Sequence, residues 1–292
     1  MVRESRYSLT MSLAMVPVLA IDAIVRRALD EDLASGDLTT EACIDPEASA
    51  VARAVARSPI VVCGGPVFAH VFAAIDPGVR VEANVADGTH VQAETTLFTL
   101  RGSARSILMG ERVALNFVQR LSGTATLARA FVDAVPPLAS TRITDTRKTT
   151  PGLRVLERYA VRVGGAKNHR DNLGAAILIK DNHIAACGGV AQAILRARAH
   201  APHTSKIECE VDSLAQLDLA LGAEADVVLL DNMDTETIRE AVRRTRGQAV
   251  TEASGGITLQ RVPELALAGV DVISVGALTH SAPAADIGLD FE

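Results

Sequence analysis

A regular alternation of short apolar runs and helical stretches in the C-terminal half constrains the fold of this chain most strongly. Six runs rich in β-branched residues are predicted to be strands, at 140–144, 175–179, 206–211, 226–230, 248–252 and 271–275. Helical periodicity fills the later intervals, at 190–200, 213–221, 234–244 and 259–267. Such alternation predicts a parallel sheet with right-handed crossovers, and apolar runs such as 175–179 indicate that both of its faces are buried.

Polar residues and glycines follow these predicted strands. The segments concerned are Thr146-Arg147-Lys148, Lys180-Asp181-Asn182-His183, Glu210, Asp231-Asn232, Ser254-Gly255-Gly256 and Gly276-Ala277. In a parallel α/β barrel the carboxyl ends of all strands open on one rim, where the active site lies. The sequence therefore predicts an α/β-barrel enzyme. The alternative is a doubly wound open sheet, but its glycine-rich nucleotide fingerprint is missing after the first strand.

The N-terminal half follows a different pattern. A helix is predicted at 21–33, and short alternating runs at 50–57, 60–63, 80–85 and 96–100 predict an antiparallel sheet. A helix at 111–134 joins the two halves. We therefore predict an α+β sandwich domain at 15–115 and a barrel domain at 116–292, whose last residues can pack back on the first domain.

The first fourteen residues are predicted to be an N-terminal extension. Arg3 and Arg6 precede an apolar stretch, which superficially resembles a short signal peptide. The stretch contains Pro17 and continues directly into an amphipathic segment, which favours an extension, or a true start at Met15, over export.

Composition excludes several functional classes. The net charge is −6, aromatic residues make up 3% and tryptophan is absent, which argues against nucleic-acid binding. No apolar run approaches the ~20 residues of a membrane span. The four cysteines form no CxxC pair, which makes a zinc site unexpected and favours a reduced, cytoplasmic compartment.

Positive charge is concentrated in one segment despite the acidic total. Nine basic residues lie between 142 and 180: Arg142, Arg147, Lys148, Arg154, Arg158, Arg162, Lys167, Arg170 and Lys180. Arg147, Lys148, His169, Arg170 and Lys180 come from three neighbouring segments and suit a substrate with several negative charges. Arg154, Arg158 and Arg162 receive no role, and solvent-exposed charge is the simplest interpretation of them.

The later strand ends suggest what else binds. The turns Ser254-Gly255-Gly256 and Gly276 can offer backbone N–H groups to phosphate. Glu210 and Asp231 end adjacent predicted strands, where two carboxylates in a cationic site indicate magnesium or ribose hydroxyls. Together these features suggest a phosphorylated sugar, a divalent cation and an acidic co-substrate.

Many motifs, in order along nearly the whole chain, resemble the quinolinate phosphoribosyltransferase family. In the first half they are Glu31-Asp32-Leu33, Gly36-Asp37-Leu38-Thr39-Thr40, Glu111-Arg112-Val113-Ala114-Leu115-Asn116 and Leu121-Ser122-Gly123-Thr124-Ala125-Thr126. In the second half they are Asp145–Gly152, Gly164-Gly165, Asn168-His169-Arg170, Ile179–His183, Glu208–Val211, Leu230-Asp231-Asn232, Glu252–Gly256 and Ser274–His280.

The resemblance implies that quinolinate and phosphoribosyl pyrophosphate give nicotinate mononucleotide, pyrophosphate and carbon dioxide, in de novo NAD synthesis. It also implies magnesium, a homodimer, and a small sandwich domain on an incomplete, seven-stranded α/β barrel. Only six barrel strands are visible in the sequence, and we expect the seventh within 154–165.

The resemblance also implies residue roles. Arg147, His169, Arg170 and Lys180 match residues that bind the two carboxylates of quinolinate, and Lys148 matches a lysine near the reacting groups and pyrophosphate. Arg112 matches an arginine donated across the dimer. Glu210 and Asp231 match carboxylates near the ribose and metal, and act with Lys148 in catalysis. The 5′-phosphate and pyrophosphate region corresponds to Ser254, Gly255, Gly256, Gly276 and His280.

Two other functions remain open from the sequence. The chain can be a paralogue with another substrate, such as the molybdenum-operon relatives of the family, although the intact Asn168–Arg170 and Lys180–His183 motifs argue against this. A barrel lyase that forms a Schiff base through Lys180 is the other alternative. The neighbouring arginines make Lys180 a better partner for a carboxylate than a desolvated nucleophile.

Overall fold

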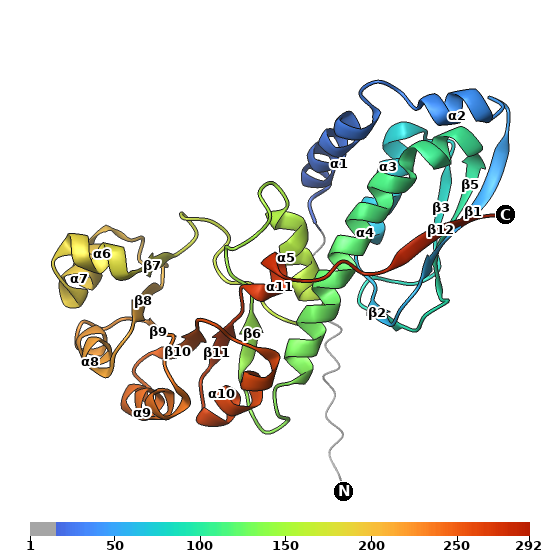
Figure 1. Ribbon diagram of the computed structural model, residues 1–292. Helices are drawn as coiled ribbons and strands as arrows, with labels where there is room; N and C mark the ends of the chain where they lie inside the picture. Colours follow the sequence, from blue (N-terminus) through green and yellow to red (C-terminus); the bar gives the residue numbers. More distant parts are fainter. Residues whose placement is uncertain (1–15) are drawn as a thin grey trace, which may run out of the picture.

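The computed structural model describes residues 16–292, and Figure 1 shows two parts joined by one long helix. The N-terminal part contains α1 (Val18–Leu33), α2 (Leu38–Cys43), β1 (Ser49–Ala56), β2 (Ile60–Val61), α3 (Gly65–Ile75), β3 (Arg80–Ala83), β4 (His90–Val91) and β5 (Thr96–Ser103). The expected extension at 1–14, the alternative start at Met15 and the signal-peptide question lie outside the described residues.

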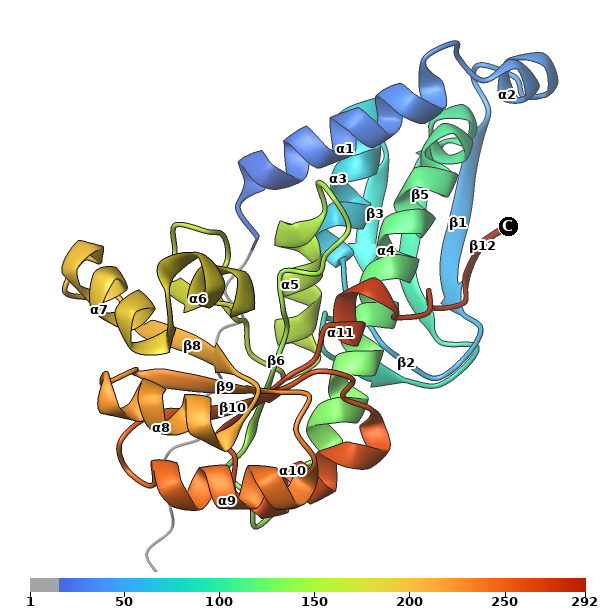
Figure 2. The ribbon, with the colours of Figure 1, turned by 60° about the vertical axis from the view of Figure 1, so that its left-hand side comes forward.

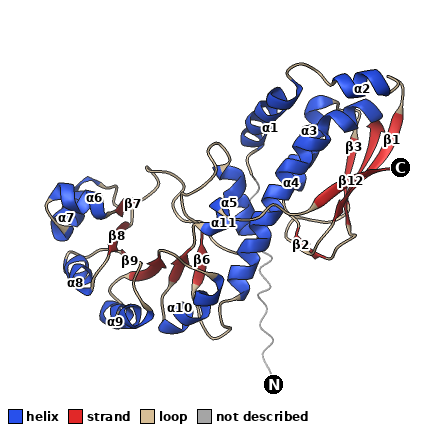
Figure 3. Cartoon of the chain, viewed as in Figure 1, coloured by secondary structure: helices blue, strands red, loops and turns tan. Residues whose placement is uncertain are grey.

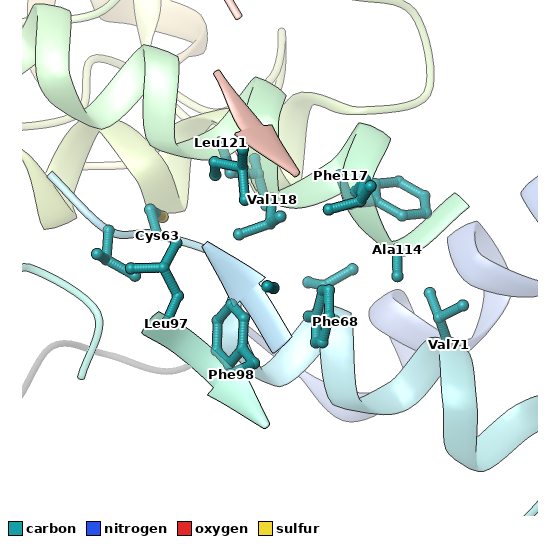
Figure 4. Close-up of a cluster of buried hydrophobic side chains, with 14 of the residues drawn as sticks. Cys63, Phe68, Val71, Leu97, Phe98, Ala114, Phe117, Val118 and Leu121 are labelled. Atoms are coloured by element: carbon teal, nitrogen blue, oxygen red, sulfur yellow. The ribbon is translucent and has the colours of Figure 1, made fainter. Parts of the chain in front are cut away.

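The N-terminal sheet is antiparallel, as predicted, with the strand order β12-β1-β5-β3. Strand β12 (Ile287–Phe291) is the last element of the chain, and it pairs with β1. The sheet packs on α3 through a core in which the rings of Phe68 and Phe98 are stacked with centroids 4.4 Å apart (Figure 4). Burying each such side chain contributes on the order of 2 kcal/mol.

Helix α4 (Ala104–Asp133) connects the two parts and starts seven residues before the predicted helix. Ser103 caps it by accepting a hydrogen bond from the backbone N–H of Ser106. The helix contributes to the core of the N-terminal part through residues such as Phe117 and to the core of the second part through Phe131. The predicted domain boundary at 115/116 lies inside this helix.

The second part is built from alternating strands and helices (Figure 3). Its elements are β6 (Arg142–Thr144), α5 (Arg154–Val163), β7 (Ile177–Ile179), α6 (Asp181–Cys187), α7 (Val190–His200), β8 (Ile207–Val211), α8 (Leu214–Gly222), β9 (Val227–Asp231), α9 (Thr235–Thr245), β10 (Val250–Ser254), η1 (Leu259–Arg261), α10 (Val262–Ala268), β11 (Val272–Ser274) and α11 (Ala277–His280). All six predicted strands and the four predicted helices are confirmed.

These six strands form one parallel sheet in the order β6-β11-β10-β9-β8-β7. Strand β6, the first of the six in the chain, pairs with β11, the last of them. The sheet forms a barrel wall with α7, α8, α9 and α10 on its outside (Figure 2). The carboxyl ends of the strands consequently share one rim, which places the site.

The expectation of a seventh strand within 154–165 was wrong, because this segment forms α5. Its apolar residues Leu156, Tyr159, Ala160 and Val163 recur at helical spacing and are buried. The free edge of β6 is instead covered by Lys167, which lies two residues beyond this segment. Thr144 forms a single parallel bridge with Lys167, so the barrel wall is incomplete between Lys167 and β7.

No helix within residues 16–292 is both long enough and apolar enough to cross a membrane.

Candidate active site

A cavity of about 530 Å³ opens at the carboxyl ends of the barrel strands. Ten of the residues singled out from the sequence line it: Arg147, Lys148, His169, Arg170, Lys180, Glu210, Asp231, Ser254, Gly255 and Gly256. They come from six separate segments, and the parallel sheet brings all of them to one rim. Another cavity, of about 460 Å³, lies between α1, α4 and residues 151–153 and contains none of the predicted site residues.

Three predicted residues are not among those lining the cavity. Gly276 lies beside it, because a Cβ atom built on Gly276 would lie 3.1 Å from Lys148 Cδ and 3.1 Å from His280 Nε2. His280 is therefore close to Lys148 through the space that Gly276 leaves open. Arg112 is exposed on α4 and does not line the cavity of its own chain.

Two arginines form the cationic wall of the cavity. Burial, followed by the charge of Arg147, lowers the pKa of Arg170. Arg170 donates to the carbonyl of Ala176 at 2.9 Å, but the buried Nε atoms of Arg147 and Arg170 have no hydrogen-bond partner among the residues that the structure describes. Two neighbouring cations that line one cavity are suited to a bound carboxylate, which would relieve their repulsion.

The two carboxylates predicted to lie near the metal are the ends of β8 and β9. Glu210 Oε2 lies 2.5 Å from Lys180 Nζ, and Asp231 Oδ2 accepts a hydrogen bond of 2.7 Å from Asn232. Magnesium commonly uses one or two carboxylates together with substrate phosphates. Glu210 and Asp231 fit this mode of magnesium binding, in which two protein carboxylates act together with substrate phosphates.

Glycine is required at the turn that follows β10. Gly255 has φ +87°, and a Cβ atom there would lie 2.2 Å from Asn232 Oδ1. This close approach brings the turn against the end of β9. The backbone of Gly255 and Gly256 consequently faces the cavity beside Asp231.

His169 and the buried Glu208 and Glu252 form a cluster that was not predicted from the sequence, and His169 and Glu252 line the cavity. His169 Nε2 lies 3.1 Å from Glu208 Oε2 and 3.6 Å from Glu252 Oε1, while His169 Nδ1 accepts from the backbone N–H of Arg170. The three side chains are close enough to hold a metal ion. Strand periodicity carried the signal, since Glu208 lies two residues before Glu210 and Glu252 two before Ser254.

Burial shifts the protonation of this cluster. Burial, followed by the charge of Glu208, raises the pKa of Glu252 to about 7, against the opposing effect of His169. Burial alone lowers the pKa of His169, but its hydrogen bond to Glu208 and the charges of Glu208, Glu252 and Asp145 raise it overall. The barrel interior therefore carries one carboxyl group, that of Glu252, whose pKa lies near neutrality.

We expect Glu252→Gln to flatten the pH dependence of stability. The pKa of Glu252 is 4.5 without the protein environment and about 7 in the fold, so the native state binds the extra proton between these values. Stability consequently falls as pH rises through this window, by about 3 kcal/mol, because each pKa unit corresponds to about 1.4 kcal/mol. Urea unfolding at several pH values should show a smaller loss in Glu252→Gln than in wild type. Exposed Glu264→Gln is the control, and equal slopes in all three proteins would contradict the prediction.

The interpretation of Arg154, Arg158 and Arg162 as solvent-exposed charges was wrong, because all three lie on α5 and donate hydrogen bonds to neighbouring loops. The side chain of Arg158 is 12% exposed, lies 3.6 Å from buried Asp145 and donates to the carbonyl of Arg170. Arg154 donates to Thr149 Oγ1 at 3.0 Å and to the carbonyl of Asp171 at 3.2 Å. Arg162 donates to Asn168 Oδ1 at 2.6 Å. These arginines therefore support the two loops that carry the cationic wall.

Asp145 organises the second of these loops from the end of β6. Its carboxylate accepts hydrogen bonds of 2.7 Å from the backbone N–H of His169 and from Asn168 Nδ2. Burial raises the pKa of Asp145, against the lowering effect of these hydrogen bonds and of Arg158. The carboxylate fixes the backbone that leads into His169 and Arg170.

The chain is similar to known proteins both in sequence and in structure. The models of the quinolinate phosphoribosyl transferase N-terminal and C-terminal domains match residues 37–122 and 124–290. A carboxylating nicotinate-nucleotide pyrophosphorylase of Mycobacterium leprae is 46% identical over 91% of this chain and 95% of the relative. A probable enzyme of the same name from Bacillus subtilis is 44% identical over 89% of each chain. The structure of the nicotinate-nucleotide pyrophosphorylase from Francisella tularensis superimposes with a TM-score of 0.90, at 39% identity, over 96% of this chain and 99% of the other.

Proposed function

This chain belongs to the quinolinate phosphoribosyltransferase family, and we propose that its cavity transfers phosphoribose from phosphoribosyl pyrophosphate to quinolinate, with loss of carbon dioxide. The observation that carries the proposal is the cationic wall, in which Arg147 and Arg170 line a cavity that is also lined by the carboxylates of Glu210 and Asp231. A dianionic aromatic acid and a polyphosphorylated sugar complement this distribution of charge. The product, nicotinate mononucleotide, places the reaction in de novo NAD synthesis.

The residues divide into two groups by the substrate that they contact. Arg147, Arg170 and Lys180, with His169, hold the carboxylates of quinolinate. Lys148 and His280 stabilise the departing pyrophosphate, and the turns at Ser254, Gly255, Gly256 and Gly276 bind phosphate through their backbone. Positive charge builds on the ribose as pyrophosphate leaves, and Glu210 and Asp231 stabilise it. The pyridine nitrogen of quinolinate attacks C1 of the ribose. The resulting positive charge on the nitrogen makes the carboxylate on the adjacent ring carbon labile, and it leaves as carbon dioxide.

Catalysis on this scheme depends on positioning and charge, since no side chain forms a bond to substrate. Glu210 and Asp231 would also hold magnesium together with phosphate oxygens. When bound, magnesium supplies further positive charge to the leaving pyrophosphate. The active unit in this proposal is a cytoplasmic homodimer, in which exposed Arg112 reaches the cavity of the neighbouring subunit.

The purified protein should convert quinolinate and phosphoribosyl pyrophosphate to nicotinate mononucleotide in a magnesium-dependent way. Carbon dioxide and nicotinate mononucleotide should form in equal amounts, and chelation of magnesium should abolish turnover. Nicotinic acid, which lacks the carboxylate that is lost, is the control substrate and should release no carbon dioxide. Absence of turnover by folded protein would contradict the proposal, and failure to bind quinolinate saturably would favour a paralogue with another substrate.

A further inference from the structure

The loop that carries Arg147 and Lys148 is held on the side away from the cavity by three residues that we call the loop anchor: the buried Glu157 and Thr279 and the partly buried Arg120. Residues 145–150 form neither helix nor strand, so contacts made outside any regular element fix their position. The loop anchor comes from three helices, α4, α5 and α11. None of its members lines the active-site cavity.

Glu157 holds the distal end of the loop. Its carboxylate is completely buried and accepts a hydrogen bond of 2.9 Å from the backbone N–H of Thr150 and one of 2.7 Å from Thr150 Oγ1. Arg120 neutralises this buried charge, with Nη2 3.0 Å from Glu157 Oε1. A buried carboxylate that is both hydrogen-bonded and ion-paired in this way is firmly located.

Thr279 holds the loop at Lys148 itself. Its completely buried hydroxyl lies 2.8 Å from the carbonyl oxygen of Lys148 and 3.2 Å from that of Gly276. Arg120 donates to the carbonyl of Thr279 and, at 2.9 Å, to that of Ala282. The contacts therefore form a closed ring from Arg120 through Glu157, Thr150, the loop and Thr279 back to Arg120.

The loop anchor also affects the position of the Lys148 side chain. Lys148 Cδ packs over Gly276, where an added Cβ would approach it to 3.1 Å. Thr279 contacts the carbonyls of both Lys148 and Gly276, so it sets the backbone of the lysine relative to the turn on which its side chain rests. A displacement of about 1 Å at a reacting group can reduce a rate by about a hundredfold.

We propose that Thr279, together with the Arg120–Glu157 pair, positions Lys148 for the transferase reaction. The inference rests on the proposed function, in which Lys148 faces the departing pyrophosphate. The loop anchor acts through Lys148 and contacts no substrate. Arg147 lies in the same loop and binds quinolinate, so loss of the loop anchor should raise the KM of quinolinate slightly and reduce kcat by a much larger factor.

The test compares Thr279→Val, which keeps the shape and removes the hydroxyl, with Thr279→Ser, which keeps the hydroxyl. Thr279→Val should reduce kcat about tenfold or more, with KM values within about threefold of wild type. Thr279→Ser should restore most of kcat. The matched control is Thr245→Val in α9, which deletes another buried hydroxyl that donates to a carbonyl at 2.8 Å. It should leave kcat unchanged.

Amide hydrogen exchange provides a readout that is independent of activity. Residues 146–150 should exchange faster in Thr279→Val than in wild type and in Thr245→Val. An unchanged kcat and unchanged exchange in folded Thr279→Val would overturn the inference. If that variant fails to fold, Thr150→Val removes one bond to Glu157 and is judged by the same measurements. Inactive wild type would instead contradict the proposed function, while the exchange comparison still decides whether the loop anchor holds the loop.

Discussion

Lys148→Ala is expected to reduce kcat by at least about a hundredfold while the protein remains folded. Loss of one preorganised donor at a developing charge typically reduces kcat by a factor of about 10² to 10³. Lys148 is exposed at the mouth of the cavity, so removing its side chain leaves no cavity in a core. Steady-state kinetics with both substrates, accompanied by thermal unfolding, measures the two effects separately.

The matched control is Lys206→Ala. Lys206 is exposed, and its Nζ lies 3.3 Å from Asp226 Oδ1 on the barrel, apart from the residues that line the cavity. It loses the same side chain and the same charge, and its kcat should equal that of wild type. A Lys148→Ala enzyme with a near-normal kcat would remove the assigned role of this lysine.

Mixing two inactive variants is expected to restore about a quarter of wild-type activity. Arg112→Ala lacks the arginine proposed to enter the neighbouring cavity, and Lys148→Ala lacks the lysine of its own cavity. In a mixed dimer one cavity combines the intact Lys148 of one subunit with the intact Arg112 of the other. Random assortment makes half of the dimers mixed, each with one of two cavities complete. Co-expression followed by activity measurement tests this expectation.

The control for complementation pairs Arg112→Ala with the double variant Arg112→Ala/Lys148→Ala. No mixed dimer of this pair contains a complete cavity, so activity should stay at the level of the single variants. Wild-type activity of Arg112→Ala alone would show that the arginine is dispensable. Failure of the first pair to complement would show that Arg112 acts within its own subunit or not at all.

Strand positions were predictable because they depend on local patterns. Residues 227–230 are all apolar whatever surrounds them, and the charge of Asp231 at their end marks the rim. The expectation of a seventh strand was wrong although the pattern there is also local. Four charged residues separate the apolar residues of α5 at helical spacing, whereas the family resemblance implied a further strand.

The partners of Glu252 and Glu157 could not be predicted from the sequence. Both are acidic residues in segments that were already recognised, but their partners His169 and Arg120 come from other elements. Alternation along β10 places Glu252 on an inward face, yet only the assembled barrel brings it to His169. Burial then raises its pKa to about 7, an effect that depends on every neighbour at once.

The sequence by itself determined the order of strands and helices and the placement of Lys148, Lys180, Glu210 and Asp231 at strand ends, because backbone periodicity is a local property. Only the tertiary structure decided which buried charges meet. The pairing of β6 with β11 brings Lys148 beside Gly276 and Thr279, about 130 residues away along the chain. Charge neutralisation and hydrogen bonding act over a few ångströms in space, and a linear pattern contains no record of those distances.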